Sequence, residues 1–79
     1  MLVFHEFPSL QHAEAFARSV TEQEKLPASF HATQGESNAV DPFPFELVPP
    51  IVLVGRGKLA IEEAIKVRVE DFGGEFAGT

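Results

Sequence analysis

The sequence predicts an α+β domain built as a two-layer sandwich, with a small, mostly antiparallel sheet and two helices on one face. Two apolar runs, near residues 2–7 and 51–55, are typical of strands that are covered on both faces. Two other segments, which begin near Leu10 and Leu59, repeat apolar residues at the spacing of one helical face. With 79 residues, the chain is expected to form a single domain over residues 1–79.

The two strongest strand predictions lie at the start and in the middle of the chain. Leu2–Phe7 carries apolar side chains on both faces, and Pro8 ends the run. Ile51–Val54 is a continuous run of β-branched residues and leucine, bounded by Pro50 and Gly55. Both runs therefore predict central strands.

The first helix is predicted directly after Ser9, a residue type that suits the N-cap position. Glu14 and Arg18 lie one turn apart on its solvated side, where they can form an ion pair. The stretch from Thr21 to Lys25 is expected to be the frayed end before Pro27. The apolar face consists of Leu10, Ala13, Phe16, Ala17 and Val20.

The second helical segment allows two interpretations. From Leu59 the apolar residues keep helical spacing up to Phe72, and Gly73 stands where a helix commonly ends. However, the apolar and polar residues of 65–70 also alternate. A shorter helix, Leu59–Lys66, could then precede an edge strand, Val67–Phe72, with a hairpin turn at the two glycines that follow.

A further strand is predicted over residues 28–33, because ASFHAT precedes the turn-forming residues of QGESN. The element order is then βαββα(β), with the last strand placed after residue 66. This order is ferredoxin-like in architecture. It is an analogy of topology and says nothing about activity.

Composition excludes several classes of function. The chain has no cysteine, which rules out disulfides and thiolate chemistry. A net charge of -6 disfavours direct binding to nucleic acid and to anionic membranes. No apolar run reaches membrane-spanning length, and the start of the chain does not resemble a signal peptide, so we expect a cytoplasmic protein.

A proline-rich stretch, VDPFPFELVPP, leads into the strand that starts at Ile51. Its four prolines cannot sit inside a sheet ladder, so the stretch is expected to be extended and unpaired. One interpretation is that the prolines preset the approach to the strand while the phenylalanines pack inward. The other is that the rigid stretch holds Phe43, Phe45 and Leu47 outward as anchors for another chain.

The stretch GRGKLA leaves a strand, enters a helix and has the G-x-G-x-x-A spacing of a dinucleotide-binding turn. Too few residues follow for that fold. What remains is a tight turn of geometric origin, or a weak site for a phosphate or an acidic side chain. The candidate anion-binding residues are Gly55, Arg56, Gly57 and Lys58.

No other residues indicate catalysis, a cofactor or a metal. The histidines His5, His12 and His31 lack metal-ligand spacing, and no serine has a nucleophile setting. The adjacent carboxylates Glu62/Glu63 and Glu70/Asp71 point apart on a helix and are expected to be solvated.

The chain is therefore expected not to be an enzyme. The leading hypothesis is a small acidic domain that acts through protein–protein contacts, either with itself as a homodimer or with another protein. A chain this short supports only a thin core, which favours association between subunits. The alternatives are a phosphate-binding module at the GRGK turn and an acidic inhibitor of a basic, nucleic-acid-binding partner.

Overall fold

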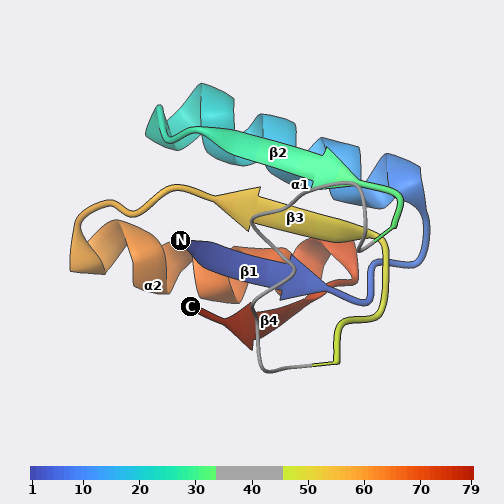
Figure 1. Cartoon of the computed structure of the whole chain (residues 1–79). Helices are drawn as coiled ribbons and strands as arrows, with labels where there is room; N and C mark the ends of the chain where they lie inside the picture. Colours follow the sequence, from blue (N-terminus) through green and yellow to red (C-terminus); the bar gives the residue numbers. More distant parts are fainter. Residues whose placement is uncertain (34–45) are drawn as a thin grey trace.

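The computed structural model describes residues 1–33 and 46–79. Their elements are strand β1 (Leu2–His5), helix α1 (Leu10–Glu24), strands β2 (Ala28–His31) and β3 (Ile51–Val54), helix α2 (Leu59–Arg68), a 3-10 helix η2 (Val69–Phe72) and strand β4 (Glu75–Gly78) (Figure 1). This is the predicted βαββαβ order. The prediction of an α+β fold is therefore confirmed.

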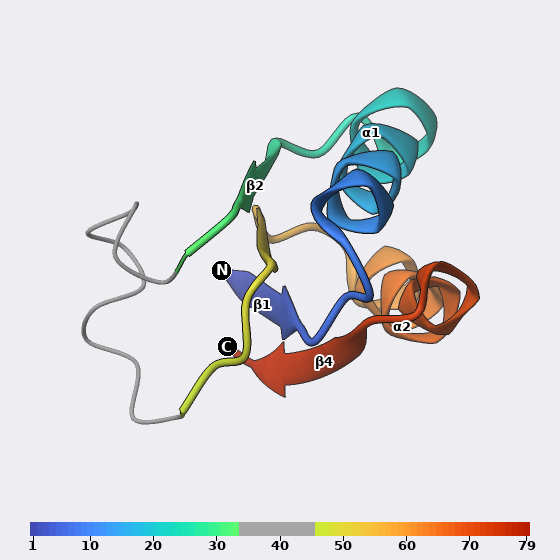
Figure 2. The same ribbon diagram turned by 90° about the vertical axis from the view of Figure 1, so that its right-hand side faces the viewer.

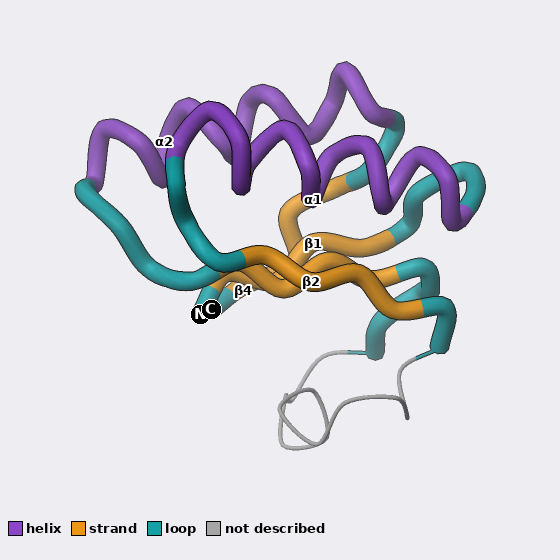
Figure 3. Tube along the Cα trace, turned by 90° about the horizontal axis from the view of Figure 1, so that it is seen from above, coloured by secondary structure: helices purple, strands orange, loops and turns teal. Residues whose placement is uncertain are grey.

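The strands form one antiparallel sheet in the order β2-β3-β1-β4. This is the ferredoxin-like arrangement, in which β3 separates β1 from β2. Both helices cover the same face of the sheet, so the molecule has two layers (Figure 2). The strands β2 and β4 form the two edges, and the view from above shows both helices on one side (Figure 3).

The central strands β1 and β3 are buried on both faces, as their apolar runs predicted. Leu2 and Phe4 point toward the helices and join the main core, which also contains Val52 and Val54. On the other face a second, smaller cluster consists of Val3, Leu47, Ile51 and Leu53. The first strand ends at His5, earlier than predicted, because Glu6 adopts a left-handed backbone with φ of 62°.

Helix α1 begins where the sequence predicts. Ser9 is the N-cap, and its side chain accepts a hydrogen bond from the His12 amide. Its apolar face buries Phe16 against three other phenylalanines. The frayed end predicted from Thr21 to Lys25 is wrong, because the helix continues to Glu24 and Lys25 ends it in the left-handed conformation. Within the described parts of the chain, neither helix is long and apolar enough to cross a membrane.

The end of the chain decides between the two interpretations of residues 59–72. Helical structure runs through Phe72, and Gly73 ends it with φ of 79°. The edge strand expected over Val67–Phe72 is wrong, and the glycine pair is a helix stop rather than a hairpin turn. A fourth strand does exist, but it lies at Glu75–Gly78.

Gly74 provides a first testable prediction. A Cβ atom on this residue would stand 2.5 Å from Cε1 of Phe7, a ring that is buried in the main core. We expect Gly74→Ala to lower the free energy of unfolding by about 1–3 kcal/mol, because the ring and the backbone must move apart. Urea denaturation of the two proteins measures this. An unchanged midpoint would show that this contact is not as close as described.

Candidate functional site

The GRGK turn between β3 and α2 binds a carboxylate of the same chain, that of Glu62. Glu62 reaches back from the first turn of α2 and accepts hydrogen bonds at Oε2 from Arg56 Nε (2.7 Å) and from the Gly57 amide (3.0 Å). Arg56 also donates from Nη2 to the other carboxylate oxygen at 3.2 Å. This two-point contact satisfies the charge of the carboxylate.

Glu62 is only 3% exposed, so the expectation that this carboxylate is solvated is wrong. The hydrogen bond from Arg56 and the bond from Gly57 lower its pKa to about 2, from an ordinary value of 4.5. An acidic side chain was one of the occupants predicted for this turn, and Glu62 is that side chain in the structure. Binding of an external anion at Gly55–Lys58 stays a prediction.

A phosphate titration tests that remaining prediction. Because Glu62 already occupies the Gly57 amide and Arg56, we expect the amide resonances of Gly55 and Gly57 to stay unchanged when phosphate is added. In Glu62→Gln the Arg56 side chain loses its charged partner and becomes available to phosphate. Saturable shifts in the wild-type protein would show that the turn binds an external anion after all.

The three anchors predicted in the proline-rich stretch have different outcomes. Phe43 and Phe45 lie outside the described residues. Leu47 is 5% exposed and packs in the smaller cluster with Val3, Ile51 and Leu53, so it points into the sheet rather than outward. The Val48 amide next to it donates to His5 Nδ1 at 3.1 Å, and the Val48 carbonyl accepts from the Glu6 amide at 2.8 Å.

The three histidines do not gather, because each has a different neighbour. His12 Nδ1 lies 2.7 Å from Ser9 Oγ, and His31 Nε2 lies 2.9 Å from Ser29 Oγ. Both pairs are exposed, and Ser9 already serves as the N-cap of α1. The described contacts give neither histidine a third group that would orient it as a general base.

His5 belongs instead to a cluster that was not predicted from the sequence. One ligand atom from each of His5, Glu6 and Glu75 lies within 4.8 Å of the others. Glu75 stands opposite His5 in the pairing of β4 with β1. The pairing of β4 with β1 brings these side chains together. The sequence predicted the last strand over Val67–Phe72 instead, so it gave no indication that Glu75 would lie near His5.

The outer edge of β2 is the second feature that the sequence did not reveal. The Gly55 amide donates to the Pro27 carbonyl at 2.8 Å, so residues 27 and 55 form a hydrogen-bonded pair. Such pairs alternate along an antiparallel ladder, and the register therefore directs the backbones of Ser29 and His31 toward β3. The backbone groups of Ala28 and Phe30 point away from the sheet.

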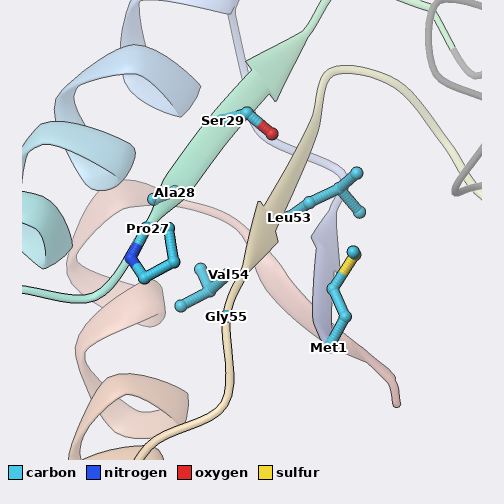
Figure 4. Close-up of a pocket in the computed structure, with 7 residues that line it drawn as sticks. All are labelled: Met1, Pro27, Ala28, Ser29, Leu53, Val54 and Gly55. Carbon is cyan, nitrogen blue, oxygen red and sulfur yellow. The ribbon is translucent and has the colours of Figure 1, made fainter.

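A shallow groove lies at one end of the sheet, where β2 begins and β3 ends, and extends to Met1 (Figure 4). It has a volume of about 310 Å³ and is lined mainly by apolar groups, including Met1, Pro27 and Leu53, with Ser29 contributing a hydroxyl. Among the described residues, those that line it include no carboxylate, imidazole or basic side chain, so none of these side chains can act as a general acid or base on a bound molecule.

Comparison with known proteins found no matching family model, no matching curated protein and no matching solved structure.

Proposed function

We propose that this protein is a non-catalytic domain that acts through contacts with other polypeptides, and that its first partner is a second copy of itself. The observation that carries the proposal is the outer edge of β2, which no other strand of residues 1–33 and 46–79 covers. This strand has no charged residue, and Phe30 stands on it with 40% of its surface exposed. An open strand edge is a template for pairing with another chain.

The other edge of the sheet offers a contrast. Strand β4 begins with the charged Glu75, and its register shifts between Val3 and Phe4. The ammonium group of Lys66 lies 4.6 Å from the centre of the Phe76 ring. Charges and irregular pairing are the devices by which proteins keep sheet edges apart. Strand β2 has neither, which favours it as the contact edge.

A second copy fits this edge because the strand is self-complementary. Around a two-fold axis at Ser29, the outward backbone groups of Ala28 meet those of Phe30 in the other copy. The Phe30 ring then covers the small side chain of Ala28 across the interface. This pairing joins two sheets into one and buries the exposed aromatic ring.

The charged side chains of α1 near the edge of β2 are compatible with the same two-fold symmetry. Phe16 of α1 faces η2, and Ser19 approaches Arg68 of α2. Helical spacing therefore places Glu14 and Arg18 on the opposite flank of α1, above the free edge of β2. These side chains pair at 2.9 Å, and antiparallel copies would bring each Glu14 toward the Arg18 of the other.

Light scattering coupled to size-exclusion chromatography tests the proposal. We expect the wild-type protein to shift from monomer to dimer as its concentration rises, and Phe30→Lys to remain monomeric, because an added charge on an edge opposes pairing. The matched control is Val67→Lys on α2, which changes a residue with 67% of its surface exposed and should leave the dimer intact.

Two results would contradict the proposal. A wild-type protein that stays monomeric at every concentration would remove self-association. Equal loss of the dimer in Phe30→Lys and Val67→Lys would show that the contact is not made by β2. A circular dichroism spectrum of each variant establishes that the loss is not due to unfolding.

A further inference from the structure

The cluster of His5, Glu6 and Glu75 at the junction of β1 and β4 has residue types that bind metals, but its hydrogen bonds do not suit a metal site. His5 Nδ1 accepts a hydrogen bond from the Val48 amide, so this nitrogen carries no proton. In the neutral ring the proton is then on Nε2, which lies 3.7 Å from Glu6 Oε2. A nitrogen that carries a proton cannot ligate a metal. In a metal-bound histidine one ring nitrogen binds the metal and the other usually donates a hydrogen bond, whereas His5 Nδ1 accepts one.

The two carboxyl groups need a proton to be held together. One carboxylate oxygen of Glu6 lies within 4.8 Å of one of Glu75. Two ionised carboxylates only accept hydrogen bonds, so a hydrogen bond between these side chains requires a proton on one of them. When both are ionised, like charges lie close together at the point where β4 begins.

We propose that Glu6 and Glu75 form a proton-operated clasp that fastens β4 to β1. With a shared proton, the carboxyl groups hold the start of β4 in place. Loss of the proton replaces this bond by repulsion and loosens the strand. The clasp lies at the opposite edge of the sheet from β2 and is independent of self-association.

The strand β4 is suited to such control. It has four residues and lies at the sheet edge, and within the described part of the chain it pairs only with β1, through a ladder that shifts its register. Edge elements with few partners open locally at low cost. When β4 opens, β1 becomes the edge of the sheet and Phe4 loses the ring of Phe76, now 5.4 Å away.

The sign of the pH dependence follows from the surroundings. The bond with Glu6, repulsion from Glu6 and burial raise the pKa of Glu75, while His5 opposes the shift. From the α2–η2 side, Lys66 and Glu70 line a hollow together with Glu75. A carboxyl group with a raised pKa stabilises the folded form at low pH, and this contribution is lost as the pH rises through the folded-state pKa.

Amide hydrogen exchange measured by NMR over a range of pH tests the clasp. In the wild-type protein we expect the protection factors of the β4 amides to fall about fivefold between acidic and neutral pH, the effect of unit charges a few ångströms apart in water. Protection of the β3 amides should stay constant. Carbon chemical shifts of the Glu6 and Glu75 carboxyl groups, recorded in parallel, follow the shared proton directly.

Glu75→Gln separates the clasp from general effects of pH, since an amide keeps a donor and removes the charge. Its β4 amides should remain protected at neutral pH, whereas Glu70→Gln should behave as the wild type. The same pH dependence in wild type and Glu75→Gln would overturn the proposal. Stoichiometric binding of Zn²⁺ at His5 Nε2, with loss of the Val48 hydrogen bond, would overturn it as well.

Discussion

Phe16→Ala is expected to leave most of the chain unfolded under conditions in which the wild type is folded. Phe16 is fully buried on α1 and has three aromatic neighbours, whose ring centres lie 5.0 Å (Phe4), 5.6 Å (Phe7) and 5.6 Å (Phe72) away. Truncating such a side chain costs about 3–5 kcal/mol. A core in a chain of this size supplies a net stability of about 3–5 kcal/mol, so little would remain.

The measurement is thermal or urea unfolding followed by circular dichroism. Phe30→Ala, recorded at low protein concentration, is the matched control, because it removes the same atoms from a ring that is 40% exposed. Its loss of stability should be well under half of that in Phe16→Ala. Cooperative unfolding of Phe16→Ala near the wild-type midpoint would contradict the view that one aromatic cluster holds both helices to the sheet.

Glu62→Gln is expected to destabilise the protein in a way that depends on pH. The change keeps the size of the side chain but removes the charge that Arg56 and the Gly57 amide stabilise. These partners lower the folded pKa of Glu62 to about 2, so its contribution is fully present above its ordinary pKa of 4.5. The contribution is lost as the pH falls from there toward 2.

Urea unfolding of the two proteins from about pH 7 to about pH 2 tests this prediction. The difference in free energy of unfolding should be constant above the ordinary pKa and should vanish at the acidic end. Glu63→Gln is the control, since the neighbouring Glu63 pairs with Lys66 at the surface, and its effect should stay within about 1 kcal/mol. A difference for Glu62→Gln that is the same at every pH would show that its charge does not matter.

Most of the fold could be predicted because it rests on local patterns. The Ser9 cap and the apolar face of α1 each depend on residues within a few positions, and the Ile51–Val54 run is hydrophobic on both faces. The end of the chain was harder, because Val67 and Val69 suit both a helix and a strand. The helical structure η2 forms instead of a strand because Val69 and Phe72 pack into the main core.

The candidate sites were less predictable because they depend on contacts between distant elements. Glu62 looked like a surface carboxylate, and only its approach to Gly57 gives it a buried role. The cluster at His5 requires the pairing of β1 with β4. Leu47 was expected to point outward, but it packs against Val3 and Ile51 on the face of the sheet without helices and is buried there.

Amide hydrogen exchange along β2, recorded at several protein concentrations, tests the central proposal most directly. The amides of Ser29 and His31 face β3 and should be protected at every concentration. The amides of Ala28 and Phe30 point away from the sheet and should gain protection only as a second copy pairs with them. If Ala28 and Phe30 exchange at the same rate from dilute to concentrated protein, β2 is not the surface through which this protein associates.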